Sequence, residues 1–211
     1  MIIYGTGTTM IIALAGNTGA GKSALARIIK KPLNARILTV AYILKANARK
    51  QGIPFERYMA SIESKHGPTA HIRALENIIR EKLKKYRTVI VEGTYKIQDI
   101  ATLQQLFPQE SIYVFYIKSE KDIRIKRIMK RKELSKDEAI KWVNRQDTIR
   151  KFKFKMGTVA QIADGRIINT GLTQRELSSE FLKQFKSAVI ARVATTLKNR
   201  VPIKTIRMPR G

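Results

Sequence analysis

A glycine-rich run near the amino terminus has the spacing of a phosphate-binding loop: Gly, any four residues, then Gly-Lys-Ser. It occupies eight consecutive positions, Gly16, Asn17, Thr18, Gly19, Ala20, Gly21, Lys22 and Ser23. The apolar run 10–15 before it predicts a strand and 24–30 after it predicts a helix, which is the context that the motif requires. Its glycines let backbone N–H groups wrap around a phosphate, and the next helix directs its positive end to the same anion. Lys22 would then reach the terminal phosphates and Ser23 would bind magnesium, so the run predicts a site for a nucleoside triphosphate and Mg²⁺ rather than an ordinary glycine turn.

Two further sets of charged residues could serve a bound triphosphate. Glu92 follows the apolar run 88–91 and could hold magnesium through water, although an acidic residue at a strand end is only moderately specific. Arg124, Arg127 and Arg131 lie at i, i+3 and i+7, so they share one face of a helix. That face either neutralises charge on a phosphoryl group or is simply a solvated basic surface.

The composition indicates a polyanionic partner. Forty-two Lys and Arg against sixteen Asp and Glu give a formal net charge of +26 over 211 residues. Because such charge repels itself, it favours a polyanionic partner, RNA or DNA most of all, over a merely lysine-rich surface. The partner that we expect is RNA or the ribosome. The absence of cysteine excludes disulfides and thiolate metal sites and fits a cytoplasmic location. No uninterrupted apolar stretch is long enough to span a bilayer, so no membrane partner is predicted, and the oligomeric state is left open.

The elements that must position these residues alternate between strand and helix. Strands are predicted at 10–15, 36–40, 88–91, 111–117 and 166–168, and helices at 24–30, 42–51, 55–65, 69–85 and 99–107. Further helices are predicted to begin near 119–122 and at two capping boxes, Ser135-x-x-Glu138 and Thr173-x-x-Glu176, the last running to about 197. This alternation predicts an α/β fold whose mostly parallel sheet has helices on both faces, with the ligand at the carboxyl ends of the strands.

Four segments resemble the nucleoside monophosphate kinase branch of P-loop proteins, and within it the dephospho-coenzyme A kinase-like proteins of archaea. They are the phosphate loop, the strand with its acid and glycine at 89–93, the arginine-rich helix followed by 142–147, and 162–164 followed by 167–171. The resemblance implies a P-loop NTPase three-layer sandwich in residues 1–185, with a mostly parallel central sheet and a helical lid at about 119–150. Residues 186–211 are then a basic helix end and an extended tail.

The same resemblance implies roles for individual residues. The residues implied to be catalytic are Lys22, Arg124, Arg127 and Arg131. In such kinases the lid arginines close over the triphosphate, neutralise the transferring phosphoryl group and exclude water. Asn169 and Gly171 belong to the loop that packs on the adenine of ATP.

The acceptor half of the predicted site departs from the family pattern. The family has an aspartate after the second strand, but 39–45 contains no acid, and Thr94-Tyr95-Lys96 stands where an arginine is usual after the third. Lys96 could substitute, but it cannot make a planar bidentate contact. Three functions therefore stay open: a dephospho-coenzyme A or nucleotide kinase, a kinase-like ATPase beside RNA or the ribosome, and a structural RNA-binding protein with vestigial catalysis. We favour an ATP- and Mg²⁺-binding kinase-like enzyme associated with RNA or the ribosome.

Some remaining residues favour ordinary structural roles. His66 and His71, five apart across a helix break, make a poor metal pair and are predicted at the surface. The run 150–155 alternates basic and aromatic residues; on a strand or loop it would either stack nucleic-acid bases or bury Phe152 and Phe154. Trp142 is predicted to lie in a helix core, and Arg145 could join the lid arginines.

Overall fold

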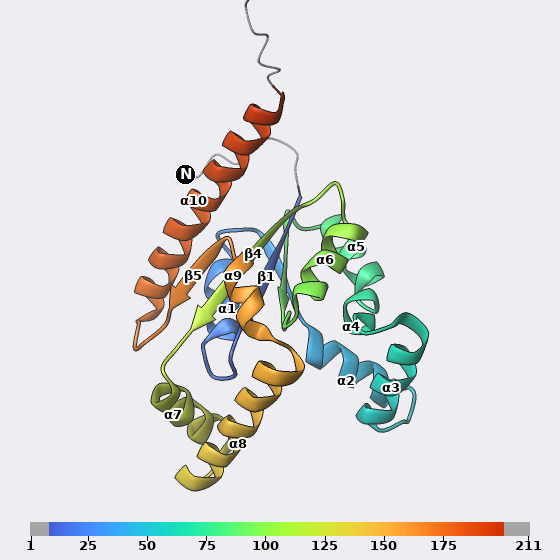
Figure 1. Cartoon of the computed structure of the whole chain (residues 1–211), viewed down its shortest axis with the longest axis vertical. Helices are drawn as coiled ribbons and strands as arrows, with labels where there is room; N and C mark the ends of the chain where they lie inside the picture. The colour runs from blue at the N-terminus through green and yellow to red at the C-terminus, as the bar shows by residue number, and fades with distance from the viewer. Residues whose placement is uncertain (1–8, 201–211) are drawn as a thin grey trace, which may run out of the picture.

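Five parallel strands form the central sheet in the order β2-β3-β1-β4-β5 (Figure 1). The computed structural model describes the backbone of residues 9–200 and the side chains of residues 9–195. The strands are β1 (Met10–Gly16), β2 (Ala35–Thr39), β3 (Thr88–Glu92), β4 (Ser111–Lys118) and β5 (Gly165–Ile168). Each lies where the sequence predicted a strand, and the predicted α/β class is confirmed.

Helices connect the strands and cover the sheet. They are α1 (Lys22–Lys30), α2 (Val40–Lys50), α3 (Phe55–His66), α4 (Ala70–Arg73), α5 (Glu76–Leu83), α6 (Ile97–Leu106), α7 (Lys121–Lys132), α8 (Lys136–Thr148), α9 (Met156–Ile162) and α10 (Gln174–Arg200), with a π-helical turn η1 (Ile149–Lys153) after α8. The single helix predicted over 69–85 is wrong, because Leu75 donates its N–H to Ile72 three residues back and this tighter turn separates α4 from α5. Helix α9 was not predicted, since only Met156 and Val159 of its seven residues are buried and so few positions set no helical period.

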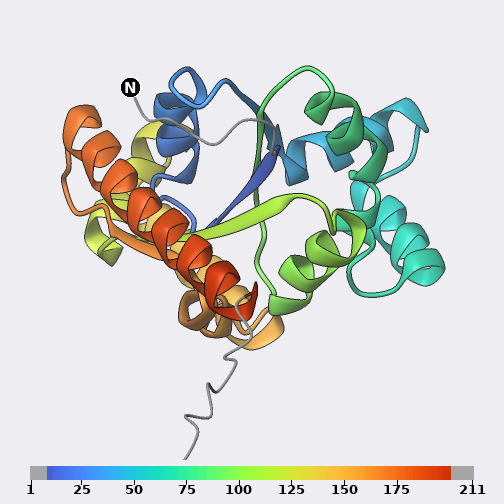
Figure 2. The same cartoon turned by 90° about the horizontal axis from the view of Figure 1, so that it is seen from above.

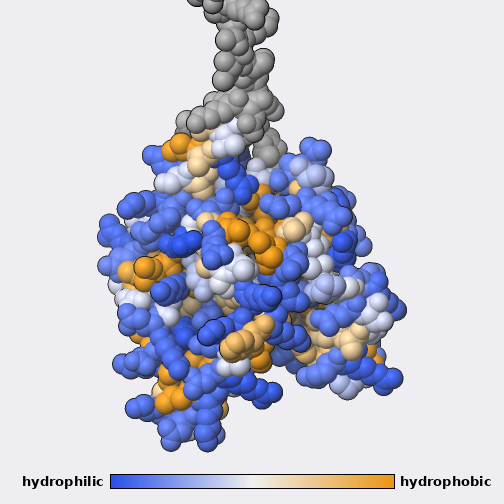
Figure 3. All heavy atoms as spheres, viewed as in Figure 1, coloured by the Kyte–Doolittle hydropathy of each residue, from blue (hydrophilic) through white to orange (hydrophobic). Residues whose placement is uncertain are grey.

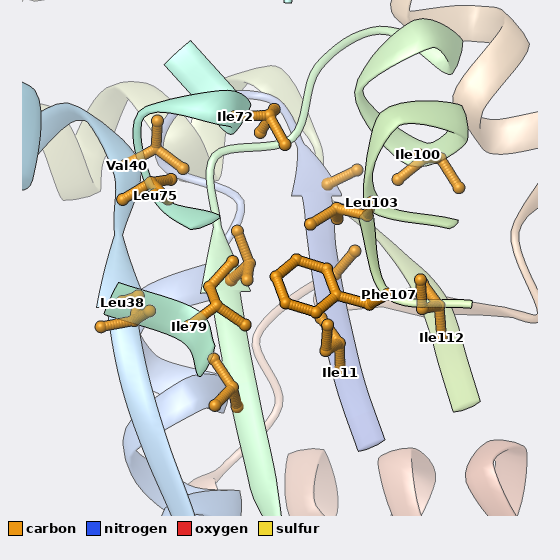
Figure 4. Packing of buried hydrophobic residues seen from close by; sticks show 14 of the residues in the cluster. Ile11, Leu38, Val40, Ile72, Leu75, Ile79, Ile100, Leu103, Phe107 and Ile112 are labelled. Carbon is orange, nitrogen blue, oxygen red and sulfur yellow. The ribbon is translucent and has the colours of Figure 1, made fainter. Parts of the chain in front are cut away.

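The core occupies both faces of the sheet. Successive residues of β1 alternate between the two faces: Ile11 and Ala13 pack in the cluster under α4, α5 and α6, while Ile12 and Leu14 pack in the cluster under α1 and α10. Figure 4 shows the first cluster, in which Ile79, Leu103 and Phe107 close over Ile11. Seen from above, α10 and α6 lie on opposite sides of the strands (Figure 2). This is the predicted arrangement of helices on both faces.

Helices α7 and α8 form a hairpin at the carboxyl ends of the strands, beside the phosphate loop (Figure 1). The hairpin has its own apolar cluster of Ile125, Ile128, Ala139 and Val143, against which the half-buried Trp142 packs. The predicted capping box begins α8: Glu138 N donates to Ser135 Oγ (3.4 Å), and Ser135 N donates to the Glu138 carboxylate (2.9 Å). Such caps satisfy backbone donors that the first turn leaves free.

The carboxyl-terminal helix α10 also begins at its predicted box, where Thr173 N donates to Glu176 at 2.8 Å. Of the predicted basic tail, residues 201–211 lie outside the described residues, and 199–200 continue α10. Within residues 9–200, no helix combines the length and apolar character needed to cross a membrane.

Candidate nucleotide and acceptor site

The phosphate loop has the backbone that its glycines predict. Gly16, Gly19 and Gly21 have φ angles of +137°, +81° and +104°, a region that residues with a Cβ rarely adopt. A Cβ on Gly16 would overlap the Ile117 carbonyl oxygen, and one on Gly21 would overlap the Asn169 side chain. Glycine is therefore required for both conformation and space, and the loop leads directly from β1 into α1.

Lys22 lies buried inside this loop. Its ammonium donates to the carbonyl oxygens of Gly16 (2.8 Å) and Asn17 (3.1 Å). The pKa of Lys22 is lowered from 10.5 to about 8. Burial of the ammonium is the main cause of this change, and the neighbouring Arg150 guanidinium is the second. A charged group that burial disfavours gains from a nearby anion, so Lys22 is suited to a phosphate in the loop.

Ser23 and Glu92 supply adjacent oxygen ligands at the carboxyl end of the sheet. Ser23 Oγ donates to Glu92 Oε1 at 2.5 Å, and Thr39 Oγ1 donates to Glu92 Oε2 at 3.3 Å. Magnesium takes oxygen ligands, typically one or two from protein, with water and substrate phosphates completing the shell. The hydroxyl and carboxylate therefore fit the predicted Mg²⁺ site, and their roles as ligands stay a prediction.

Arg124 joins the two helices of the hairpin formed by α7 and α8. Its guanidinium makes a bidentate pair with Asp147 on α8 (2.8 and 2.7 Å), and it also donates to the Thr18 carbonyl at 3.4 Å. Only 4 % of Arg124 is exposed. In this arrangement Arg124 braces α7 against α8 and the loop, and its direct part in catalysis stays a prediction.

Arg127 and Asn169 hold the outer side of the loop. Arg127 donates to the Gly19 carbonyl (3.1 Å) and to Asn169 Oδ1 (3.3 Å), while Asn169 Nδ2 donates to the Ala20 carbonyl (2.8 Å). The structure thus brings the segment after β5 against the loop, and contact of this segment with adenine stays a prediction. The neighbouring Gly171 is exposed, with a φ of +78°.

Arg131 and Arg145 are both exposed. Arg131 is nevertheless close enough to Lys22 to contribute to lowering its pKa. Its place near the phosphates is thus compatible with the predicted role, which stays a prediction, whereas no such contact joins Arg145 to Lys22.

Arg150 is a site residue that sequence reasoning missed. It is 8 % exposed, donates to the Gln146 side chain at 3.1 Å, and its Nε has no partner among the described residues. Its guanidinium lies 5.1 Å from the centre of the Tyr95 ring. The alternating run 150–155 contained the signal, but it forms a π-helical turn and the start of a bend rather than a strand or loop. That turn directs Arg150 inward and leaves Phe152 69 % exposed, so the predicted burial of Phe152 is wrong.

A cavity of about 570 Å³, called here the acceptor cavity, lies beside Arg150 and is lined by residues of α2, α3 and the segment after β3. Its apolar wall comes from Val40 and Leu44 of α2 and Met59 of α3. Its opposite wall carries Tyr95 and Phe154, whose rings stack at 5.6 Å and 10°. Lys96 also lines it, with its ammonium 5.4 Å from the Phe154 ring centre and donating to the Pro68 carbonyl at 3.1 Å. Arg150 lines both this cavity and a polar hollow of about 540 Å³ that begins at Asn17.

His71 and Asp99 lie at the same cavity, so the prediction that His71 lies at the surface is wrong. The His71 side chain is only 12 % exposed, and its Nε2 is 3.0 Å from Asp99 Oδ1. The turn of α4 directs His71 inward, onto the carboxylate in the first turn of α6. His66, at the end of α3, is exposed as predicted.

Comparison with known proteins finds relatives at the level of sequence. No family model matches the chain. A UPF0200 protein of Pyrococcus abyssi is 31 % identical over 172 residues, covering 79 % of this chain and 90 % of the relative. Cytidylate kinases of Sulfurisphaera tokodaii and Methanocaldococcus jannaschii are 22 % and 24 % identical, covering 87 % and 69 % of this chain and 98 % and 78 % of the relatives.

Solved structures share the fold. An uncharacterized protein from Eubacterium ventriosum has a TM-score of 0.57 at 17 % identity, with 85 % of this chain and 99 % of that chain covered. Shikimate kinase from Aquifex aeolicus has a TM-score of 0.53 at 15 % identity, with 86 % and 99 % covered. The loop, the sheet and these relatives make the chain a P-loop protein of the nucleoside monophosphate kinase type, and it belongs to the UPF0200 family.

Proposed function

We propose that the protein is an Mg²⁺- and ATP-dependent phosphotransferase whose acceptor binds in the acceptor cavity. One observation carries this proposal: Arg150 is nearly buried, its Nε has no partner among the described residues, and it both lines that cavity and is close enough to Lys22 to lower its pKa. A buried cation with unused donor capacity is costly, but it suits a site where a phosphoryl group passes between two ligands. A nucleotide-binding protein without transfer would need the loop but not this second cation.

The chain's own residues would divide the work between binding and charge stabilisation. The loop amides and Lys22 hold the terminal phosphates of ATP. Magnesium at Ser23 and Glu92 would neutralise phosphate charge. Arg150 faces the charge that develops while an acceptor oxygen attacks the γ-phosphorus and the bond to ADP breaks. Arg124 and Asp147 keep the lid in place, which excludes water from this reaction.

The relatives support a kinase without naming its substrate. Two of them are cytidylate kinases, which favours a small-molecule acceptor. The apolar wall and stacked rings of the acceptor cavity fit an acceptor with a flat or apolar part. Dephospho-coenzyme A and nucleotides, the acceptors that the family resemblance implies, are such molecules.

A pair of lysine variants tests the proposal. Lys22→Met removes the buried ammonium of the loop, whereas Lys30→Met makes the same change at an exposed position of the same helix. With ATP, Mg²⁺ and a panel of nucleosides, nucleoside monophosphates and dephospho-coenzyme A, we expect the wild type and Lys30→Met to produce ADP and a phosphorylated acceptor. Lys22→Met should lose about a hundredfold or more in rate, as expected when a charge stabiliser is removed. Equal rates in both variants would rule out the loop as the site of transfer.

Arg150 is tested in the same way. Arg150→Met should lower kcat, while Arg145→Met, the same change at the exposed position of α8, should not. A loss confined to the KM for ATP would place Arg150 in nucleotide binding alone.

Association with RNA is a second candidate function, favoured by basic residues far from the loop. Lys31 and Arg36 flank the amino-terminal end of β2, and Lys85 precedes that of the adjacent strand β3; all three are exposed. The face drawn in Figure 3 is mostly hydrophilic with several apolar patches, and the chain carries a net charge of +26. The nucleotide site uses none of this edge.

Charge reversal tests the RNA candidate. Binding to an unstructured RNA should weaken steeply with salt, since each neutralised phosphate adds to the slope. Lys31→Glu, Arg36→Glu and Lys85→Glu together should reduce the slope by about 2, at about 0.7 for each phosphate contact on a single strand. Reversing the exposed Lys50, Lys65 and Lys141 should change it less. Equal slopes for the two triple variants would reject this edge as the RNA surface.

A further inference from the structure

We infer that the acceptor presents a hydroxyl group, and that His71, oriented by Asp99, takes the proton of that hydroxyl. This inference rests on the proposed phosphotransferase function and specifies its substrate class. It also identifies a base where the segment 39–45 provides no acid.

The carboxylate of Asp99 is fixed before any ligand binds. It is completely buried, and its Oδ2 accepts the backbone N–H groups of Tyr95 (2.8 Å) and Lys96 (3.0 Å). Its Oδ1 lies 3.0 Å from His71 Nε2 and has no well-aligned hydrogen bond among the described residues. Oδ2 of Asp99 therefore accepts hydrogen bonds from the backbone, whereas Oδ1 lies next to the imidazole.

The position of the Asp99 carboxylate favours one tautomer of the neutral His71 imidazole. A carboxylate beside Nε2 favours the tautomer whose proton is on that nitrogen, so Nδ1 carries the lone pair. Nδ1 makes no hydrogen bond to any residue in the described part of the chain. Both His71 and Asp99 line the acceptor cavity, which places an oriented base at the surface that the acceptor would contact.

The chemistry of the acceptor decides whether such a base is needed. A phosphate acceptor arrives as an oxyanion and has no proton that must leave, whereas an alcohol must lose one as it attacks. A positioned general base contributes about 10²–10⁴ to such a step.

The proposed reaction transfers one phosphoryl group and releases one proton. A lone pair of the acceptor oxygen forms a bond to the γ-phosphorus, and the bond from that phosphorus to the bridging oxygen of ATP breaks. The electron pair leaves with ADP, the hydroxyl proton passes to His71 Nδ1, and the imidazolium is stabilised by the Asp99 carboxylate. The proton then returns to water, so the products are ADP, a phosphate monoester and one proton.

A purely structural pair is the competing explanation, because His71 and Asp99 also join α4 to α6. That explanation predicts a loss of stability in His71 variants with no change in the pH profile of kcat. Other titratable or charged groups also line this cavity, and they are the same under both explanations. They are Glu56 and Glu63 of α3, Tyr95 and Lys96 before α6, and Arg150 and Lys153 of η1.

The test identifies the product and then the base. The full-length protein is given ATP, Mg²⁺ and a panel of nucleosides, dephospho-coenzyme A and nucleoside monophosphates, and phosphorus NMR distinguishes a phosphate monoester from a phosphoanhydride. We expect a monoester. His71→Ala should then lower kcat about a hundredfold or more with little change in the acceptor KM, and should remove the acidic limb of the kcat profile. His66→Ala, the same change at an exposed position, should leave both unchanged.

The outcomes separate this inference from the proposed function. A phosphoanhydride product, or a His71→Ala enzyme that keeps its kcat and acidic limb, would overturn the inference while the phosphotransferase stands. Absence of transfer to every acceptor would overturn the proposed function, and the inference with it. Should His71→Ala fail to fold, His71→Gln keeps a similar shape without a basic ring nitrogen, and Asp99→Asn should lower kcat while retaining the acidic limb.

Discussion

The affinity for ATP should fall as the pH rises through about 8, because Lys22 loses its proton there in the free protein. Burial first, and then Arg150, lower the pKa of this ammonium from 10.5 to about 8. A bound triphosphate favours the charged form and returns the pKa toward its ordinary value. Below about pH 8 the ammonium is present before binding, and above it ATP must bind together with a proton, so affinity declines in that direction.

The size of the decline follows from the two pKa values. If ATP restores the pKa to 10.5, the dissociation constant should rise about tenfold between about pH 7 and about pH 9. Binding should take up about 0.8 proton near pH 8.5 and about 0.1 near pH 7. Arg150→Met removes the second-largest cause, so the midpoint should move to higher pH.

Titration calorimetry in buffers of different ionisation enthalpy measures both quantities. Lys22→Arg is the matched control, since a guanidinium keeps its proton over this range, and its proton uptake should vanish even if its affinity is lower. A wild-type affinity that is equal at the two pH values, or a proton uptake that persists in Lys22→Arg, would show that Lys22 does not hold the phosphates.

Three further variants and one control variant test the scaffold in urea unfolding. Arg124→Met should cost about 3 kcal/mol, because it leaves Asp147 without its bidentate partner in a largely buried pair; a loss under about 1 kcal/mol would show that the pair does not brace the lid. Gly16→Ala should cost more than about 1 kcal/mol through its positive φ and crowding, while Gly157→Ala, which meets open space, should be neutral or stabilising. Ser135→Ala should cost about 1 kcal/mol by removing the cap of α8, and an unchanged midpoint would deny that role.

Much of the fold was predictable because its signals are local. The glycine spacing at 16–21, the capping boxes at Ser135 and Thr173, and the apolar runs of the strands each depend on residues within one turn or strand. The parallel direction of the strands follows from the alternation of strands and helices along the chain. The break between α4 and α5 was missed because the apolar period continues through Leu75, and periodicity alone does not reveal a tighter turn.

The candidate site was less predictable, because its residues meet through tertiary contacts. Lys22, Ser23 and Glu92 belong to recognisable motifs, but Arg150, His71 and Asp99 carry no motif. The spacing of His71 and Asp99 in the sequence does not indicate that His71 Nε2 lies 3.0 Å from Asp99 Oδ1. Likewise, nothing local indicated that Arg124 would pair with Asp147 on the next helix. Side chains that meet across elements require the fold before their chemistry can be recognised.

Transfer of the γ-phosphoryl group tests the central claim most directly. The protein is incubated with Mg²⁺ and ATP radiolabelled at the γ-phosphate, together with the acceptor panel, and the label is followed by chromatography. We predict that the label moves to a small acceptor with the wild type and with Lys30→Met, and stays on ATP with Lys22→Met. Label that remains on ATP, or appears only as inorganic phosphate, with the wild-type protein and every acceptor would contradict the assignment as a phosphotransferase.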